Sequence, residues 1–390
     1  MRRPPTFPIV LAGFAAFLDL YSTQPILPLL TRVFGTSSLG VSLTITAPTI
    51  AVAIAAPFAG RFADRVGPRS VIVGSAFMLA VATLFAATSQ TLTQLILWRF
   101  VQGLATPGVF ATAMAYIHEE WPATRVGRGT AAYMSGTVVG GFTGRAITGV
   151  VASHWSWRWS FVALGLVSAV VAGVLSLWLP VERRAHHRDT LARRPAQALF
   201  KNPQLAATFA VGFCVLCAQV AMFTYVPFPL SAPPFNLSTA ALGWIFSVYL
   251  LGAIVTPFSG RWIDVHGPRV ALAAAVSMGV SGALLTLSHS LPLVIVGLSV
   301  FATGVFVSQA SATSHVGANA GDDRGLAIGL YSTFYYLGGS TGGALPALAW
   351  SRAGWPGCVA LVIGVQFVTL ATAFAAWTPR TGTHAEPTPV

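Results

Sequence analysis

A single acidic residue, Asp19, lies inside the first long apolar stretch of the chain, within FLDLYSTQPILPLL at residues 17–30. An ionised carboxylate at the centre of a lipid bilayer costs about 3 kcal/mol on insertion scales. Keeping the carboxyl group neutral at pH 7 costs about 4 kcal/mol against its tendency to ionise in water. Because the two costs are similar, Asp19 is predicted to load and release a proton.

Two arginines, Arg99 and Arg145, also fall inside apolar stretches. An arginine close to Asp19 would favour the ionised carboxylate, and a substrate that displaced the arginine would favour the protonated form. This arrangement would couple substrate binding to proton release or uptake. The alternative is an ion pair or cluster that only fixes helix packing.

Polar side chains share helix faces with these charged residues. Arg99, Gln102 and Thr106 stand at positions i, i+3 and i+7, so they form one polar stripe, which we expect to face a cavity. Ser22 and Thr23 share the face of Asp19, and Gln24 is less well aligned with it. Further candidates for the cavity lie in the second half of the chain, and helix packing explains their residue types equally well. They are Gln219, Tyr225, Tyr249, Ser308, Gln309, Tyr331, Tyr335 and Tyr336.

The composition identifies the elements that must hold these residues. Of the 390 residues, 55% are hydrophobic and only 8% are charged, whereas soluble domains carry about 25% charged residues. Apolar stretches of about 20 residues, long enough to cross a bilayer as helices, recur along the chain. We therefore expect an all-α membrane protein with twelve transmembrane helices, at residues 8–30, 40–60, 70–88, 92–116, 129–152, 159–180, 204–227, 239–260, 270–288, 291–315, 326–350 and 356–378.

The net charge of +12 does not indicate a nucleic-acid-binding protein, because the basic residues follow the expected topology of the membrane. With both termini in the cytoplasm, most of the 22 Lys and Arg residues fall in cytoplasmic segments, and only Arg32, Arg158 and Arg352 fall outside. This bias orients multi-span proteins of an inner membrane. The first apolar stretch imitates a secretory signal but has no small-residue cleavage site, so we expect it to remain as the first span.

One long polar segment, residues 181–204, is too charged to enter lipid and divides the spans six and six. We expect a six-helix bundle at 1–180, a cytoplasmic linker at 181–203, and a second bundle at 204–390 that ends in a short cytoplasmic tail. The cysteines fall in apolar spans and are expected to pack there without binding a metal or cofactor: Cys214, Cys217 and Cys358.

The two halves of the chain repeat each other. PFAGRFADRVGPR at 57–69 returns as PFSGRWIDVHGPR at 257–269, and YMSGTVVGGFTGRA at 133–146 returns as YSTFYYLGGSTGGA at 331–344. Two parallel six-helix repeats describe a transporter architecture in which substrate binds near the bilayer midplane between the halves.

The repeat does not reproduce the intramembrane charges. It places Ala221 opposite Asp19 and Gly343 opposite Arg145, and every other acidic residue falls in a loop or at a helix end. A charge that served only to stabilise the fold would more naturally occur in both halves, so the comparison favours a functional role.

The chain resembles the major facilitator superfamily along essentially its whole length. GRFADRVGPR resembles the superfamily's signature loop, and LILWRFVQG at 95–103 resembles its fourth-span motif. HEEWPATRVGRG at 118–129 and HWSWRWSFVALG at 154–165 are similar to loops of bacterial efflux permeases in the drug:proton antiporter branch. The resemblance implies the major facilitator fold, with two six-helix pseudo-repeats, and a proton-transfer role for Arg99.

The fifth span departs from this branch, because it lacks the usual Gly-Pro pair. It has instead Gly136, Gly140, Gly141 and Gly144, followed by Arg145. The departure weakens the antiporter assignment and leaves the fold unchanged. Glycines at this spacing are expected to allow close helix contact.

The signature loop is expected to act as a gate rather than to bind substrate. A carboxylate near the start of a helix interacts favourably with the helix dipole, and arginines at the membrane face can pair across the halves when the inner side is closed. The gating residues that the resemblance supports are Gly60, Arg61, Asp64, Arg65, Gly67, Arg69, Gly260, Arg261 and Asp264.

The sequence thus predicts a monomeric inner-membrane secondary transporter with no cofactor, whose partners are lipid, protons and a small organic molecule. The preferred mechanism is export of a drug-like compound, sugar or metabolite against a proton carried by Asp19, with Arg99 tuning its affinity. Arg145 is expected either to contact the substrate or to pair with Asp19.

Uptake of an organic anion or metabolite is an alternative, because two arginines against one aspartate leave a buried positive charge. A membrane enzyme or a non-transporting sensor is a further alternative, without the clustered catalytic groups that an enzyme needs.

Overall fold

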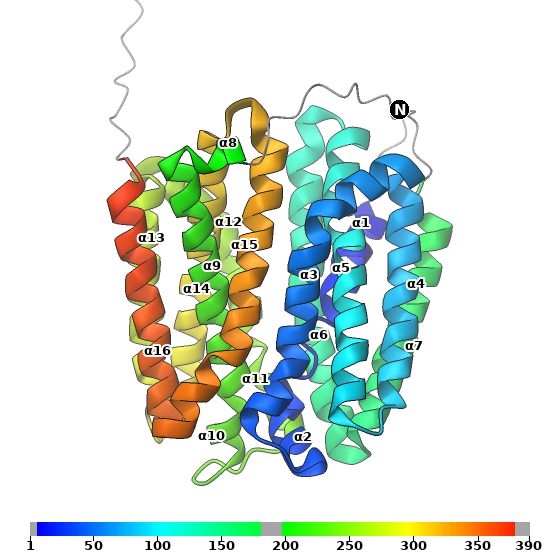
Figure 1. Cartoon of the computed structure of the whole chain (residues 1–390), viewed down its shortest axis with the longest axis vertical. Coiled ribbons are helices and arrows are strands. Elements are labelled where there is room, and N and C mark those ends of the chain that lie inside the picture. Colours follow the sequence, from blue (N-terminus) through cyan, green and yellow to red (C-terminus); the bar gives the residue numbers. More distant parts are fainter. Residues whose placement is uncertain (1–5, 181–196, 379–390) are drawn as a thin grey trace, which may run out of the picture.

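The computed structural model describes residues 6–180 and 197–378, and this part of the chain is helical with no strand. The helices form two bundles that stand side by side (Figure 1), the first coloured blue to cyan-green and the second green to red. Residues 181–196, which make up most of the linker expected at 181–203, and residues 379–390 at the expected cytoplasmic tail lie outside the described residues.

The first bundle contains six transmembrane spans, of which the first is split. Its elements are α1 (Thr6–Leu18), η1 (Gln24–Ile26), α2 (Leu27–Phe34), α3 (Ser38–Val66), α4 (Pro68–Ala87), α5 (Leu92–Glu120), η2 (Ala123–Arg125), α6 (Val126–His154) and α7 (Trp157–Trp178).

The second bundle repeats this pattern after a short helix. Its elements are α8 (Gln197–Phe200), α9 (Pro203–Tyr225), α10 (Pro227–Ser231), α11 (Thr239–Ile245), α12 (Val248–His266), α13 (Pro268–Leu285), α14 (Leu291–Asn319), η3 (Gly321–Asp323), α15 (Arg324–Ala344) and α16 (Pro346–Ala376).

The predicted all-α fold with twelve spans is confirmed. In the described residues, eight helices are long and apolar enough to cross a membrane by themselves. The other four spans are the two split ones, α1 with α2 and α11 with α12, and the glycine-rich α6 and α15. Three of these spans lie at the contact between the bundles, where α6 contacts α11 and α12, and α15 contacts α3. Helix α1 packs against α6 within the first bundle.

The prediction of one continuous helix over 8–30 is wrong. Helix α1 ends at Leu18, residues 19–23 form turns, and a 3-10 turn leads into α2. The Ser22 hydroxyl donates to the main-chain oxygen of Asp19 at 2.9 Å, and Pro25 has no N–H to donate back along the helix. Both features favour a turn over a continuing helix.

The repeated loops close in the same way in both bundles. Gly67 and Gly267 adopt φ values of 96° and 83°, where a side chain would be strained, and each ends one helix and precedes a proline that begins the next. Arg69 then donates to the main-chain oxygens of Ser176 and Leu179, which are at the end of α7. Arg269 does the same at the end of α16, so each bundle ties its own last helix to this loop.

The two bundles touch mainly away from these loops. We call the end that carries Arg61, Arg69, Arg261 and Arg269 the basic end, and the other the opposite end. Towards the opposite end α3 contacts α15 and α6 contacts α11. The Tyr225 hydroxyl of α9 lies 3.3 Å from Ser42 Oγ of α3, so this hydrogen bond joins the bundles there. The same hydroxyl lies 3.2 Å from the main-chain oxygen of Gly343.

A glycine face brings α6 against α1, which is the kind of close helix contact that the glycine spacing predicted. A Cβ added to Gly136, Gly140 or Gly144 would overlap the main-chain oxygen of Val10, Phe14 or Leu18. Only glycine allows this approach, and it fixes where α1 ends relative to Arg145, one residue after Gly144.

We expect Gly140→Ala to lower the thermal stability of the detergent-purified protein, although alanine favours a helix by about 1 kcal/mol. The added methyl group cannot fit, and overpacking of this kind costs about 1–3 kcal/mol. The matched control is Gly74→Ala on α4, which is exposed with open space beside it and should leave the unfolding temperature unchanged or raise it. Equal unfolding temperatures for the two variants would contradict the close contact.

Candidate functional site

The carboxyl group of Asp19 points into the first bundle. Its side chain is 1% exposed, and Oδ2 accepts a hydrogen bond from the Ser168 hydroxyl of α7 at 3.0 Å. Oδ1 has no partner in the described residues, since the nearby Thr83 hydroxyl donates to the main-chain oxygen of Leu79. A buried carboxylate with one hydrogen bond is poorly solvated, which favours binding a proton.

Arg99 satisfies the broken end of α1. Its guanidinium donates to the main-chain oxygens of Asp19 at 2.8 Å, Leu20 at 2.5 Å and Thr44 at 3.0 Å, rather than to the Asp19 carboxylate. It also donates to Gln102 Oε1 at 2.5 Å. The end of a helix carries a partial negative charge, so a buried cation there is stabilised by the helix as well as by the nearby carboxylate.

The predicted polar stripe of α5 lies inside the first bundle instead of facing a cavity. Gln102 donates to the Thr83 hydroxyl at 2.6 Å, and Thr106 donates to the main-chain oxygen of Gln102 at 2.9 Å. Both side chains are buried, and Gln102 also accepts a hydrogen bond from Arg99.

Arg145 lies between the bundles and does not pair with Asp19. Its Nε donates to Gln24 Oε1 at 2.7 Å and its Nη1 to the main-chain oxygen of Gly141 at 2.6 Å. Gln24 in turn donates to the Thr224 hydroxyl of α9 at 3.2 Å, which carries the hydrogen-bonded chain into the second bundle.

Aromatic rings from both bundles surround the Arg145 guanidinium. Its central carbon lies 5.1 Å from the Tyr21 ring centroid, 4.9 Å from that of Phe246 and 5.0 Å from that of Tyr249. These are cation–π distances. Arg145 is 4% exposed, and among the described residues none of its contacting groups is a carboxylate.

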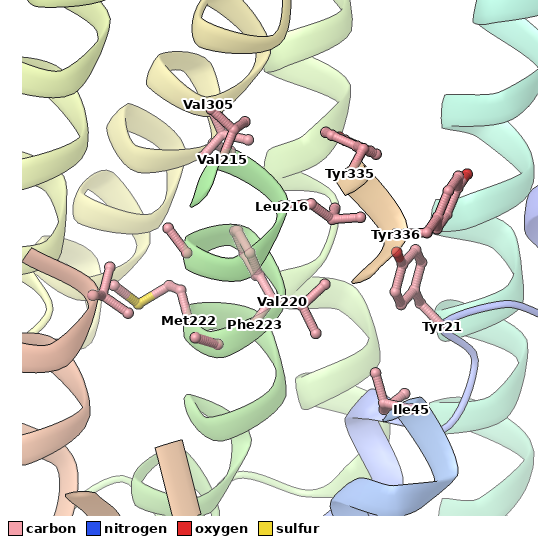
Figure 2. Close-up of a cluster of buried hydrophobic side chains, with 14 of the residues drawn as sticks. Tyr21, Ile45, Val215, Leu216, Val220, Met222, Phe223, Val305, Tyr335 and Tyr336 are labelled. Atoms are coloured by element: carbon pink, nitrogen blue, oxygen red, sulfur yellow. The ribbon is translucent and has the colours of Figure 1, made fainter. Parts of the chain in front are cut away.

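A wall of tyrosines continues from this ring cage. Tyr331 and Tyr335 stack with centroids 5.8 Å apart, and Tyr335 meets Tyr336 edge-on at 5.6 Å. Figure 2 shows Tyr21 of the first bundle beside Tyr336 and Tyr335 of the second. We call the residues Tyr21, Arg145, Phe246, Tyr249, Tyr331, Tyr335 and Tyr336 the interface cage.

A crevice of about 290 Å³ opens between α6 and α12 on the side of the cage nearer the basic end. Ser135, Val138 and Val139 line it from α6, and Leu250 and Ile254 from α12. Val138 is one helical turn from Gly141, which bonds Arg145, and Leu250 follows Tyr249. The crevice therefore lies beside the interface cage, although no residue of the cage lines it.

The other predicted cavity residues are dispersed. Thr23 meets the Thr44 hydroxyl at 3.2 Å inside the first bundle, and Tyr225 belongs to the contact at the opposite end. Gln219 is half-buried close to Tyr249, and Gln309 is half-buried on α14. Ser22 closes the turn after Asp19 and Ser308 is buried.

The predicted gating residues occupy the basic end. Arg61, Arg65, Arg261 and Asp264 are exposed there, and Asp64 is half-buried. Arg69 donates to main-chain oxygens at the end of α7 in its own bundle. The glycines of this group are Gly60 and Gly260, which have open space beside them, and Gly67, which ends α3.

Sequence reasoning missed three contributors: Tyr21, Phe246 and Ser168. Tyr21 stands two residues after Asp19, which was a usable signal because a turn can present both side chains. Phe246 falls at the split of α11 and α12, inside the range 239–260 that was expected to form one continuous span.

Known proteins similar to this chain agree with the fold. The family model described as Major Facilitator Superfamily matches residues 9–230 and 228–389. The chain is 31% identical to the inner membrane transport protein YnfM of Escherichia coli over 94% of this chain and 88% of the relative. It is 30% identical to the MFS-type transporter YybF of Bacillus subtilis, over 94% and 92%. The nucleoside transporter NupG shares its fold, with a TM-score of 0.77, 14% identity and coverage of 96% of this chain and 100% of that one.

Replacing Arg99 with lysine is expected to lower the stability of the protein by about 3 kcal/mol, because one ammonium group cannot reach the four oxygens that the planar guanidinium serves. Thermal unfolding in detergent measures the change. Arg352→Lys is the matched control, since Arg352 is exposed. An Arg99→Lys protein that unfolds at the wild-type temperature would show that the carbonyls at the break do not depend on Arg99.

Proposed function

Since this chain belongs to the Major Facilitator Superfamily, we propose that it is a secondary transporter that exports a small organic molecule in exchange for a proton. The observation that carries the proposal is the break in the first span. The same short segment holds a buried carboxyl group on one side and contacts the interface cage on the other.

Asp19 is the proton carrier in this mechanism. Its carboxyl group has one hydrogen bond and one oxygen without a partner in the described residues, so a bound proton reduces the cost of burying it. When the proton leaves, the carboxylate attracts Arg99 more strongly. Arg99 holds the carbonyls of Asp19 and Leu20, so a change in the charge of Asp19 acts directly on the backbone of the break.

The break transmits this change to the substrate site. Tyr21 and Gln24 both contact Arg145, and Gln24 also bonds Thr224 of the second bundle. A shift of residues 19–24 therefore alters the interface cage and a contact between the bundles together. Protonation and substrate binding then favour different arrangements of the same segment, which is the requirement for coupling.

Alternating access follows from where the bundles touch. The described conformation joins the bundles towards the opposite end, where Tyr225 bonds Ser42, and has the crevice between α6 and α12 nearer the basic end. Placing the basic end at the cytoplasmic face puts Arg61, Arg65 and Arg261 on the inner side of the membrane, in line with the positive-inside rule. This is then an inward-facing state that receives substrate from the cytoplasm, and rocking of the bundles would release the substrate outside.

We expect Asp19→Asn to abolish proton-driven transport while leaving expression and thermal stability near those of the wild type, because asparagine keeps the Ser168 hydrogen bond but cannot release a proton. The measurement is substrate transport by purified protein in liposomes with and without an imposed pH gradient. Substrate exchange without a gradient should persist in the variant. Wild-type acceleration of Asp19→Asn by the gradient would remove this residue from the mechanism.

The direction of transport is tested in everted membrane vesicles. Export predicts that substrate accumulates inside such vesicles when they are energised and leaks out when a protonophore removes the proton gradient. Accumulation in right-side-out vesicles instead would identify an uptake system and contradict export.

A further inference from the structure

We propose that the transported substrate is an organic anion that carries an acid group on a planar, aromatic body, and that it binds with the acid group on Arg145 and the body against the tyrosines of the interface cage. This inference rests on the proposed transport function and adds the chemical class of its substrate.

The charge of Arg145 is the first reason. A guanidinium buried at membrane depth requires compensation, and its contacts in the described residues are an amide, a main-chain carbonyl and three neutral rings. The intramembrane carboxyl group of Asp19 is held by Ser168 inside the first bundle. Two of the five N–H groups of Arg145 donate to Gln24 and Gly141, so donors remain for a carboxylate, which the planar guanidinium binds with two parallel hydrogen bonds.

The walls of the cage are the second reason. Five of the eight tyrosines of the sequence lie in it, with Phe246, and they come from both bundles. Aromatic rings favour a planar apolar ligand, which they contact by stacking or edge-to-face packing. Simple sugars offer many hydroxyls and need as many hydrogen-bonding partners, whereas this wall is mainly ring surface.

Buried hydroxyl groups around the cage are the third reason. The hydroxyls of Tyr331 and Tyr133 have no hydrogen-bond partner among the described residues, although both side chains are at least nine-tenths buried. Tyr331 belongs to the cage, whereas Tyr133 lies in the core of the first bundle. Buried polar groups normally find a partner, so the Tyr331 hydroxyl is available for a polar substituent of the ligand.

The surface beside the cage has a matching character. Four of the five residues that line the crevice between α6 and α12 are apolar. These are the helices that carry Arg145 and Tyr249, so an apolar ligand approaching between them meets an apolar lining.

A purely structural role for Arg145 is the competing explanation, because Arg145, Gln24 and Thr224 link the bundles whether or not an anion binds. The two explanations differ in what ligand binding requires. A structural link predicts no preference for negatively charged ligands, whereas an anion site predicts that such a preference exists and disappears with the guanidinium.

The test measures binding to the full-length protein in detergent without a proton gradient, by calorimetry or intrinsic tryptophan fluorescence. The probes are benzoate, 1-naphthoate and indole-3-acetate, each with its neutral amide, and acetate as an acid without a ring. We expect at least one aromatic acid to bind about tenfold or more tightly than both its amide and acetate. Arg145→Gln should remove the preference over the amide, a loss of about 10- to 100-fold.

Two further variants keep the result interpretable. Arg32→Gln removes an exposed arginine and should bind as the wild type does. Tyr249→Leu should weaken the aromatic acid but not acetate, and it tests the cage if Arg145→Gln does not fold. The proposal is overturned if no aromatic acid exceeds its amide in the wild type, or if a folded Arg145→Gln keeps the preference.

Failure of the proposed proton coupling would leave a different signature. Asp19→Asn would then transport like the wild type under a pH gradient, while the selectivity for aromatic acids persisted. Loss of anion selectivity with intact coupling would instead contradict only the substrate class.

Discussion

The structure depends on one constraint, that every main-chain polar group within a membrane needs a hydrogen-bond partner inside the protein. The first span breaks that pattern, because its helix stops at Leu18 and leaves carbonyl groups exposed at bilayer depth. Arg99 restores it by donating to the main-chain oxygens of Asp19 and Leu20 at the start of the break and to that of Thr44 on α3. A buried cation, a broken helix and a nearby carboxyl group thus support one another, and none of the three would be stable in lipid alone.

This arrangement places the proposed proton site and the proposed substrate site in different parts of the molecule. Asp19 and Arg99 lie inside the first bundle, where the proton is proposed to bind, while Arg145 lies among aromatic rings between the bundles, where the substrate is proposed to bind. The segment that joins them contains only a few residues. Its backbone is held by Arg99 and its side chains Tyr21 and Gln24 by Arg145, so each arginine holds a different part of one short non-helical segment.

The sequence was sufficient to predict the fold, because apolar length, loop charge and the internal repeat all reflect the same bilayer. It also identified the three intramembrane charges and the glycine face of α6. The sequence did not predict which residues the three charged side chains contact. Helical periodicity placed Arg99, Gln102 and Thr106 on one face correctly but assigned that face to a cavity, since periodicity does not tell a bundle interior from a bundle interface. The cage was missed in part because Tyr21 and Phe246 lie at breaks, where the spacing of a continuous helix no longer applies.

The most direct test of the central claim is hydrogen exchange, measured by mass spectrometry, of the peptide that covers residues 19–26 at a series of pH values. After correction for intrinsic exchange, protection of this peptide in the wild type should change with pH as the Asp19 carboxyl group titrates, and it should be independent of pH in Asp19→Asn. The same pH dependence in both proteins would contradict the account, because the break would then respond to some group other than Asp19.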